Sequence, residues 1–164
     1  MSIAFYPGSF DPITLGHLNI IRRASRVFDK VYVCVMINSE KKPLFTRDER
    51  VELIERVVGH LGNVAVDTSE TLVVSRAKEL GAGVIVKGLR AVSDFDKEFQ
   101  MALANKIIEP DIETLFMASS TKYAYLSSSV VKEMARHGTD LGEFVPRQII
   151  GDIMRKMSNN GKRA

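Results

Sequence analysis

The opening stretch of the chain, residues 3–17, restricts the fold more than any other part of the sequence. The apolar run from Ile3 to Tyr6 predicts a buried strand, which Pro7-Gly8 ends. A polar turn containing Asp11-Pro12 follows, and an amphipathic pattern begins at Thr14. A buried strand, a tight turn and a helix in direct succession predict the first unit of an α/β domain.

The helix that begins at Thr14 carries an imidazole on its apolar face. Its apolar residues recur at helical spacing: Ile20, Ile21, Ala24 and Phe28. His17 lies on the same face, in the first turn, where unpaired backbone N–H groups and the helix dipole favour a bound anion. Gly16 lets an anion approach the main chain closely. We therefore predict a phosphate-binding site that contains an imidazole, although the position alone also suits a histidine that caps the helix or packs against it.

Length and composition suit a single domain. We place it at residues 1–157 of the 164, with a flexible basic tail at 158–164, and 45% hydrophobic content is enough for a core. The net charge of +3 is modest. Four basic residues lie in the last ten positions: Arg155, Lys156, Lys162 and Arg163. We therefore expect no nucleic-acid partner.

The single cysteine, Cys34, lies inside an apolar run and predicts a buried thiol, which excludes an internal disulfide or a multi-cysteine metal site. No apolar run approaches about 18 residues, and no charged segment followed by an apolar one opens the chain. We expect a cytoplasmic protein with no membrane partner.

Apolar strands alternate with helical patterns along the chain. Strands are predicted at residues 3–6, 31–37, 64–66, 84–86 and 114–117. Helices are predicted at residues 14–29, 46–60, 71–80, 94–107, 129–136 and 146–157. Thr46 and Glu49 match a capping box, and Ser93 and Pro146 are expected at the starts of two later helices. Successive βαβ units with right-handed crossovers predict an α/β fold, a five-stranded parallel sheet with helices on both faces.

Polar or basic residues follow four of the predicted strands at their carboxyl ends. They are Ser9, Lys41, Lys87 with Arg90, and the serine-containing segment 118–129. In open parallel sheets, ligands bind beyond the carboxyl ends of the strands, near the point where the strand order reverses. The sequence thus predicts one ligand site at this edge of the sheet.

The two common nucleotide-binding fingerprints are missing from the sequence. There is no Gly-x-x-x-x-Gly-Lys-Ser/Thr segment, and Gly81-Ala82-Gly83 precedes a predicted strand instead of following one. This argues against a P-loop kinase and a nicotinamide enzyme. His, Cys, Asp and Glu show no metal-ligand spacing either, so we expect any Mg²⁺ to be carried by substrate phosphates.

A second anion site is predicted at Ser127-Ser128-Ser129, where three hydroxyl groups enter a helix. Ordinary helix capping explains this segment equally well when it is considered alone. His60 and His137 lie near helix C-termini, where a cation suits the dipole, and we assign neither a catalytic role.

Two segments resemble the signatures of the nucleotidyltransferase superfamily. Thr14-Leu15-Gly16-His17 has the Thr-x-Gly-His form of the first signature. Leu126 to Lys132 resembles the second, Ile-Ser-Ser-Thr-x-x-Arg, with Leu126, Ser129 and Lys132 as departures. Together with residues 7–12, 41–43 and 87–90, these segments resemble the bacterial phosphopantetheine adenylyltransferase family from Ala4 to about Phe144.

The resemblance implies a Rossmann-like nucleotidyltransferase fold and transfer of the adenylyl group of ATP to 4′-phosphopantetheine, giving dephospho-coenzyme A and pyrophosphate. It makes His17 the catalytic residue. The implied phosphopantetheine contacts are Ser9, Lys41, Val73, Lys87 and Asn105. The implied ATP contacts are Ser9, Phe10, His17, Gly88, Leu89, Arg90, Glu98, Tyr123, Ala124, Tyr125, Leu126, Ser127, Ser128 and Ser129. Many family members have Arg where this chain has Lys87, which keeps the charge but loses bidentate geometry.

The resemblance also implies a homohexamer, because family members assemble in that way. The apolar neighbourhood of Phe95, Phe99 and Met101 is therefore expected in the core or at subunit contacts.

Two other functions stay open at this point. A related transferase that uses CTP and an alcohol phosphate such as glycerol phosphate shares the first signature. A nucleotide-sensing module without activity would have lost His17 or the basic loops, and the sequence keeps both.

Direct attack by the phosphate of the acceptor suits the chain, because a phosphate monoester is already an anion at neutral pH and needs no general base.

Overall fold

The sheet has the predicted parallel architecture. The computed structural model describes residues 1–37 and 42–161. Five parallel strands, β1 (Ile3–Gly8), β2 (Lys30–Met36), β3 (Val64–Ser69), β4 (Val84–Leu89) and β5 (Glu113–Ala118), lie in the order β3-β2-β1-β4-β5. The chain runs outward from β1 through β2 to β3 and then returns to the other side of β1. The strand order therefore reverses between β1 and β4, which is where such sheets bind ligands.

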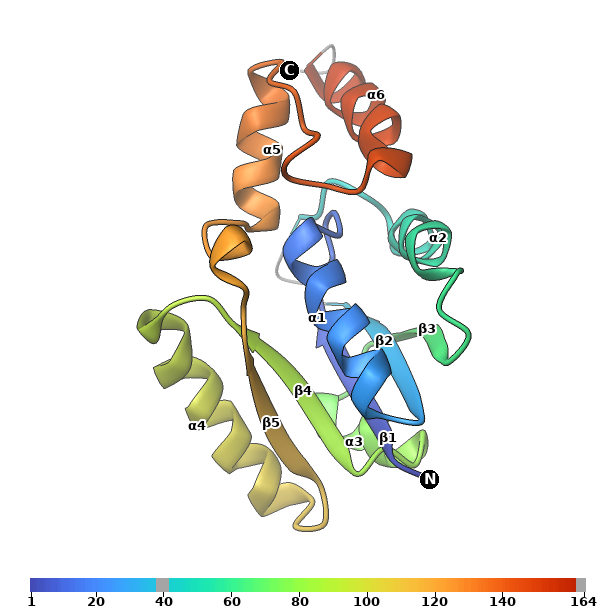
Figure 1. The fold of residues 1–164 in the computed structure, drawn as a ribbon, viewed down its shortest axis with the longest axis vertical. Helices are drawn as coiled ribbons and strands as arrows, with labels where there is room; N and C mark the ends of the chain where they lie inside the picture. Colours follow the sequence, from blue (N-terminus) through green and yellow to red (C-terminus); the bar gives the residue numbers. More distant parts are fainter. Residues whose placement is uncertain (38–41, 162–164) are drawn as a thin grey trace.

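Helices cover both faces of this sheet (Figure 1). Helices α1 (Leu15–Val27), α2 (Arg47–Val58), α5 (Ser128–Arg136) and α6 (Ile150–Gly161) share one apolar core with the sheet. Helix α3 (Val73–Glu79) packs on the opposite face, and α4 (Val92–Ile108) lies beside β5 at the edge away from α2. Short 3₁₀ helices, Thr121–Tyr123 and Arg147–Ile149, precede α5 and α6.

The central strands are apolar on both sides because both sides are covered. Along β1, Ala4 and Tyr6 belong to the core under α1, whereas Phe5 belongs to the core under α3. Cys34 of β2 lies in the second core and is fully buried, so the prediction of a buried thiol is confirmed. Burial raises the pKa of this thiol to about 12, which makes it unreactive at neutral pH.

Several predicted boundaries were wrong, including that of β3, which continues to Ser69 beyond the predicted end at residue 66. Strand β4 continues to Leu89 because it keeps pairing with β5, so Lys87 and Gly88 lie inside the strand. Ser93 is not a cap: α4 begins after Ala91, and no side chain among the described residues caps it. The last helix begins at Ile150 and extends to Gly161, beyond the predicted end near Met157.

The extra length of α6 has a physical cause in its contacts. Met154 and Met157 pack against the main core, which continues the apolar face of the helix. Arg155 pairs with Asp152, and Lys156 pairs with Glu49 of α2, so these two basic residues belong to a packed helix and not to a tail. Within the described ranges, no helix is both long and apolar enough to span a membrane.

Candidate functional site

A cavity of about 800 Å³ lies at the carboxyl ends of β1 and β4, where the strand order reverses. It is bordered by the β1–α1 turn, the start of α4 and the entry to α5. Twelve of the predicted site residues line it: Ser9, Phe10, His17, Lys87, Gly88, Arg90, Glu98, Tyr123, Leu126, Ser127, Ser128 and Ser129. The structure thus brings residues from several distant segments of the sequence to one place.

Five predicted contacts in the described part of the chain do not line this cavity: Val73, Leu89, Asn105, Ala124 and Tyr125. Val73 begins α3 and packs against the core under that helix, and Asn105 is buried in α4. Tyr125 is largely exposed. As ligand contacts these residues stay predictions. Lys41 falls outside the described residues.

Thr14 and His17 cap the start of α1 reciprocally. The backbone N–H of His17 donates to Thr14 Oγ1 at 3.2 Å, and the backbone N–H of Thr14 donates to His17 Nδ1 at 3.1 Å. A backbone N–H can only donate, so Nδ1 must be the unprotonated nitrogen of the ring. The neutral imidazole therefore carries its proton on Nε2, and the ring lines the cavity.

The charge state of His17 follows from its surroundings. Burial lowers the pKa of the imidazole from 6.5 to about 4, and the positive charge of Arg90 acts in the same direction. At neutral pH the ring is uncharged. His17 thus offers the cavity a hydrogen-bond donor and not a cation.

Aromatic contacts fix the position of the His17 ring. Phe10 packs edge-on against His17, with ring centroids 5.0 Å apart, and edge-on against Tyr6 at 5.5 Å. Phe10 adopts a φ of 45°, unusual for a residue with a side chain, and its ring is buried. A Cβ at Gly8 would lie 2.9 Å from this ring, so glycine is needed there.

The predicted phosphate-binding cations are held by carboxylates. Lys87 Nζ lies 3.1 Å from Glu98, and Arg90 Nε lies 3.1 Å from Asp94. Arg90 also donates from Nη1 to the carbonyl oxygen of Leu126 at 2.9 Å, which ties the end of β4 to the segment before α5. These pairs keep the cations at the cavity instead of in bulk solvent.

The three serines have different roles. Ser127 is the N-cap of α5 and accepts a hydrogen bond from the Val130 N–H at 3.1 Å. Ser128 Oγ donates to the Pro12 carbonyl oxygen at 2.8 Å and joins α5 to the β1–α1 turn. The capping interpretation is therefore confirmed for Ser127, and because all three serines border the cavity, the anion site stays a prediction.

The charged residues of the site that sequence reasoning missed include Arg50 and Asp11, which are both buried. Arg50 of α2 is only 5% exposed, lines the cavity and donates from Nη1 to the Ser9 carbonyl oxygen at 2.9 Å. The helical spacing could have identified Arg50 as buried, because Arg50 lies three and four residues before Leu53 and Ile54 on the buried face of α2. Asp11 is 6% exposed and also lines the cavity.

The described residues contain no group of three or more His, Cys, Asp or Glu side chains that could hold a metal ion. The carboxylates of Asp11, Asp94 and Glu98 line the cavity, but each is paired with a basic side chain. This donor set suits a Mg²⁺ ion whose ligands come mainly from a bound triphosphate.

Comparison with known proteins agrees with the geometry. Residues 5–134 match the model of the cytidylyltransferase-like family. The chain is 53% identical to the phosphopantetheine adenylyltransferase of Heliobacterium modesticaldum over 95% of this chain and 93% of the relative. It is 55% identical to the phosphopantetheine adenylyltransferase of Clostridium tetani over 97% and 99%.

The fold is shared with more distant enzymes. The solved structure of Plasmodium falciparum nicotinic acid mononucleotide adenylyltransferase, complexed with NaAD, superposes with a TM-score of 0.66 at 13% sequence identity. The superposition covers 97% of this chain and 95% of that one. At this identity the likeness shows the fold alone, and it confirms the Rossmann-like nucleotidyltransferase architecture.

The depressed pKa of His17 predicts a specific acid sensitivity. As pH falls from about 6.5 to about 4, the unfolded chain binds a proton at this ring that the folded chain does not, so the free energy of unfolding falls. The decrease in the free energy of unfolding that comes from His17 should reach about 3 kcal/mol at pH 4. Urea unfolding at a series of pH values should show that the free energy of unfolding falls less steeply with decreasing pH in His17→Gln than in the wild type. Parallel pH curves for the two proteins would contradict the assigned charge state.

Proposed function

The chain belongs to the phosphopantetheine adenylyltransferase family, and we propose that its adenylyl transfer takes place in the cavity around His17 by direct in-line attack. The overall reaction joins the AMP part of ATP to 4′-phosphopantetheine and releases pyrophosphate, giving dephospho-coenzyme A. The observation that carries the mechanism is the neutral imidazole, fixed with Nε2–H as its donor at the point where the strand order reverses.

In the proposed step, a phosphate oxygen of the acceptor attacks the α-phosphorus of ATP. A bond forms between that oxygen and the α-phosphorus, and the bond from the α-phosphorus to the bridging oxygen breaks, so pyrophosphate leaves with the electron pair. No proton has to be removed from an anionic phosphate. His17 Nε2–H donates to an α-phosphate oxygen as negative charge builds there, and catalysis rests on positioning and electrostatic stabilisation.

The acceptor side is assigned to Ser9, Lys41 and Lys87. Lys87 supports this assignment because it pairs with Glu98 of α4, on the side of the sheet where α3 and α4 lie. Val73 begins α3 and Asn105 lies in α4, so a pantetheine arm bound by both would extend away from Lys87 along these helices.

The leaving pyrophosphate is assigned to Arg90 and to the serines at the start of α5. The N-terminus of α5 favours an anion, and Arg90 is held next to it through the Leu126 carbonyl oxygen. We propose that Mg²⁺ is carried by the ATP phosphates, where it would offset their charge. Phe10, Gly88 to Arg90, Glu98 and residues 123–129 are the proposed ATP contacts. The cytoplasm is the proposed location, because ATP is available there.

A pyrophosphate-release assay tests the proposed substrates. ATP with 4′-phosphopantetheine should give one pyrophosphate per dephospho-coenzyme A formed, whereas CTP with glycerol phosphate should give none above background. Dephosphorylated pantetheine should also be inactive, because its hydroxyl needs a base that the proposed site does not use. Faster turnover with CTP and glycerol phosphate than with ATP and 4′-phosphopantetheine would overturn the proposed substrates.

Replacing the imidazole tests its role in the transition state. His17→Ala should lower kcat by about 10²- to 10³-fold, as for other single donors to a developing oxyanion, and change the affinity for ATP little. The exposed His137 offers a matched control, and His137→Ala should behave as the wild type. Weaker ATP binding with unchanged kcat would contradict the role given to His17.

The exposed apolar face of α4 supports self-association, and the family resemblance implies that six chains assemble. Val92, Phe95, Phe99, Leu103 and Ile107 are all at least 38% exposed and recur at helical spacing. An exposed apolar stripe of this length is typical of protein–protein interfaces. Sedimentation should give a mass of six 18.3 kDa chains, and Leu103→Glu should shift it toward the single chain. A wild-type protein that sediments as a monomer would contradict this proposal.

A further inference from the structure

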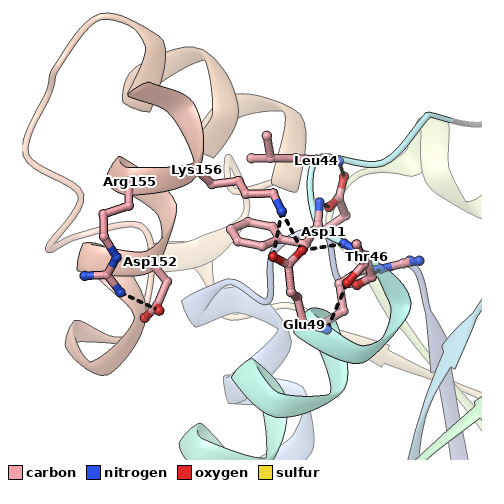
Figure 2. A network of polar contacts seen from close by, with 9 residues as sticks. Asp11, Leu44, Thr46, Glu49, Asp152, Arg155 and Lys156 are labelled. Atoms are coloured by element: carbon pink, nitrogen blue, oxygen red, sulfur yellow. Dashed lines mark hydrogen bonds and ion pairs between the residues drawn. The ribbon is translucent and has the colours of Figure 1, made fainter. Parts of the chain in front are cut away.

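The carboxylate of Asp11 joins three segments that border the cavity. Oδ1 accepts a hydrogen bond from the Phe45 N–H at 2.8 Å, and Oδ2 accepts one from the Leu44 N–H at 2.9 Å. Lys132 Nζ of α5 donates to Oδ2 at 3.0 Å. Figure 2 shows Asp11 close to Leu44 at the start of the segment that leads into α2.

These three segments carry different parts of the site. Asp11 lies in the β1–α1 turn, shortly before the Thr14–His17 cap. Leu44 and Phe45 directly follow Lys42 and Pro43, which line the cavity on the α2 side. Lys132 lines it on the α5 side, together with the serines. One buried side chain therefore relates the segment after Lys42, the start of α5 and the helix that carries the imidazole to one another.

Arg50 supports the same junction from α2. It donates from Nη1 to the Ser9 carbonyl oxygen at 2.9 Å and from Nε to the Thr46 carbonyl oxygen at 3.4 Å. The β1–α1 turn and the segment before α2 are thus connected twice, by Asp11 and by Arg50. Both residues are buried, so water does not compete strongly for their hydrogen bonds.

We propose that Asp11 is a positioning residue of the adenylyl transfer, which fixes the segment after Lys42 and the helix with Lys132 relative to His17. This inference rests on the proposed function. In-line displacement needs the acceptor oxygen, the α-phosphorus and the leaving oxygen aligned, and Asp11 sets the distance between the segments that hold the two ends. Its two oxygens already accept three N–H donors, two from the backbone and one from Lys132, which suits a positioning role better than that of a general base or a metal ligand.

Glu49 provides a matched control in the same stretch. Its Oε2 accepts a hydrogen bond from the Thr46 N–H at 2.7 Å, and both carboxylate oxygens pair with Lys156 of α6 at 2.6 and 2.7 Å (Figure 2). Like Asp11, it therefore binds one end of the segment before α2 and one lysine of a later helix. Unlike Asp11, it does not line the cavity.

The test compares Asp11→Asn with Glu49→Gln in the full-length protein. Asp11→Asn keeps the side-chain shape but replaces one acceptor oxygen by an NH₂ group, which opposes either the Phe45 N–H or both the Leu44 N–H and the Lys132 ammonium. We expect kcat to fall about 10- to 100-fold and the KM for the phosphopantetheine acceptor to rise, while the affinity for ATP stays within about twofold of the wild type. Glu49→Gln should keep kcat within about twofold.

Further measurements separate positioning from other roles. Equilibrium titration with ATP counts the folded, binding-competent fraction of each variant, so a lower kcat cannot come from lost protein. The pH dependence of kcat and the Mg²⁺ concentration for half-maximal rate should stay as in the wild type. A changed pH profile would identify a base, and a raised Mg²⁺ requirement would identify a metal ligand; either result overturns the inference.

Lys132→Gln covers the case in which Asp11→Asn does not fold, because it removes only the α5 arm of the junction. It should lower kcat relative to the wild type, by less than the roughly 10- to 100-fold loss expected of Asp11→Asn, while the affinity for ATP stays unchanged. The inference also fails if Asp11→Asn and Lys132→Gln both keep the wild-type kcat, or if kcat falls as much in Glu49→Gln as in Asp11→Asn. A wild-type protein inactive with ATP and 4′-phosphopantetheine would instead refute the proposed function, so the two failures are distinguishable.

Discussion

The reciprocal cap between Thr14 and His17 is the interaction on which the site depends. It satisfies two backbone N–H groups at the start of α1, as any capping box does. Because the second partner is a histidine, the same hydrogen bonds also choose the tautomer and direct the protonated nitrogen away from the helix. In the proposed mechanism, helix formation therefore also prepares the transition-state donor, which is in place before any substrate binds.

The rest of the cavity is arranged around this donor by paired charges. Lys87, Arg90 and Lys132 each lie within salt-bridge distance of a carboxylate, so these cations are held near the positions where phosphates would bind. Exposed ion pairs contribute little to stability, but here they limit the freedom of long side chains and reduce the entropy lost on binding. Positioned charge of this kind suits the proposed in-line transfer from an anionic nucleophile, which needs no general base.

The fold was predictable from local patterns, and much of the site was not. The continuous apolar character of β1 and β2 requires a sheet covered on both faces, and Thr46 with Glu49 forms the predicted capping box. Asp11 and Lys132 are 121 residues apart in the sequence, and Arg50 and Ser9 are 41 apart, so no local pattern could pair them. The end of α6 was missed for the same reason, since Lys156 is held by Glu49, 107 residues earlier.

The protonation state of the His17 ring nitrogens is the most direct test of this mechanism. A two-bond ¹H–¹⁵N correlation spectrum of histidine-labelled protein at pH 7, assigned by comparison with His17→Gln, distinguishes the two tautomers from the imidazolium ion. We predict an unprotonated Nδ1 and a protonated Nε2, both in the free protein and with ATP bound. An imidazolium spectrum, or a proton on Nδ1, would contradict the mechanism.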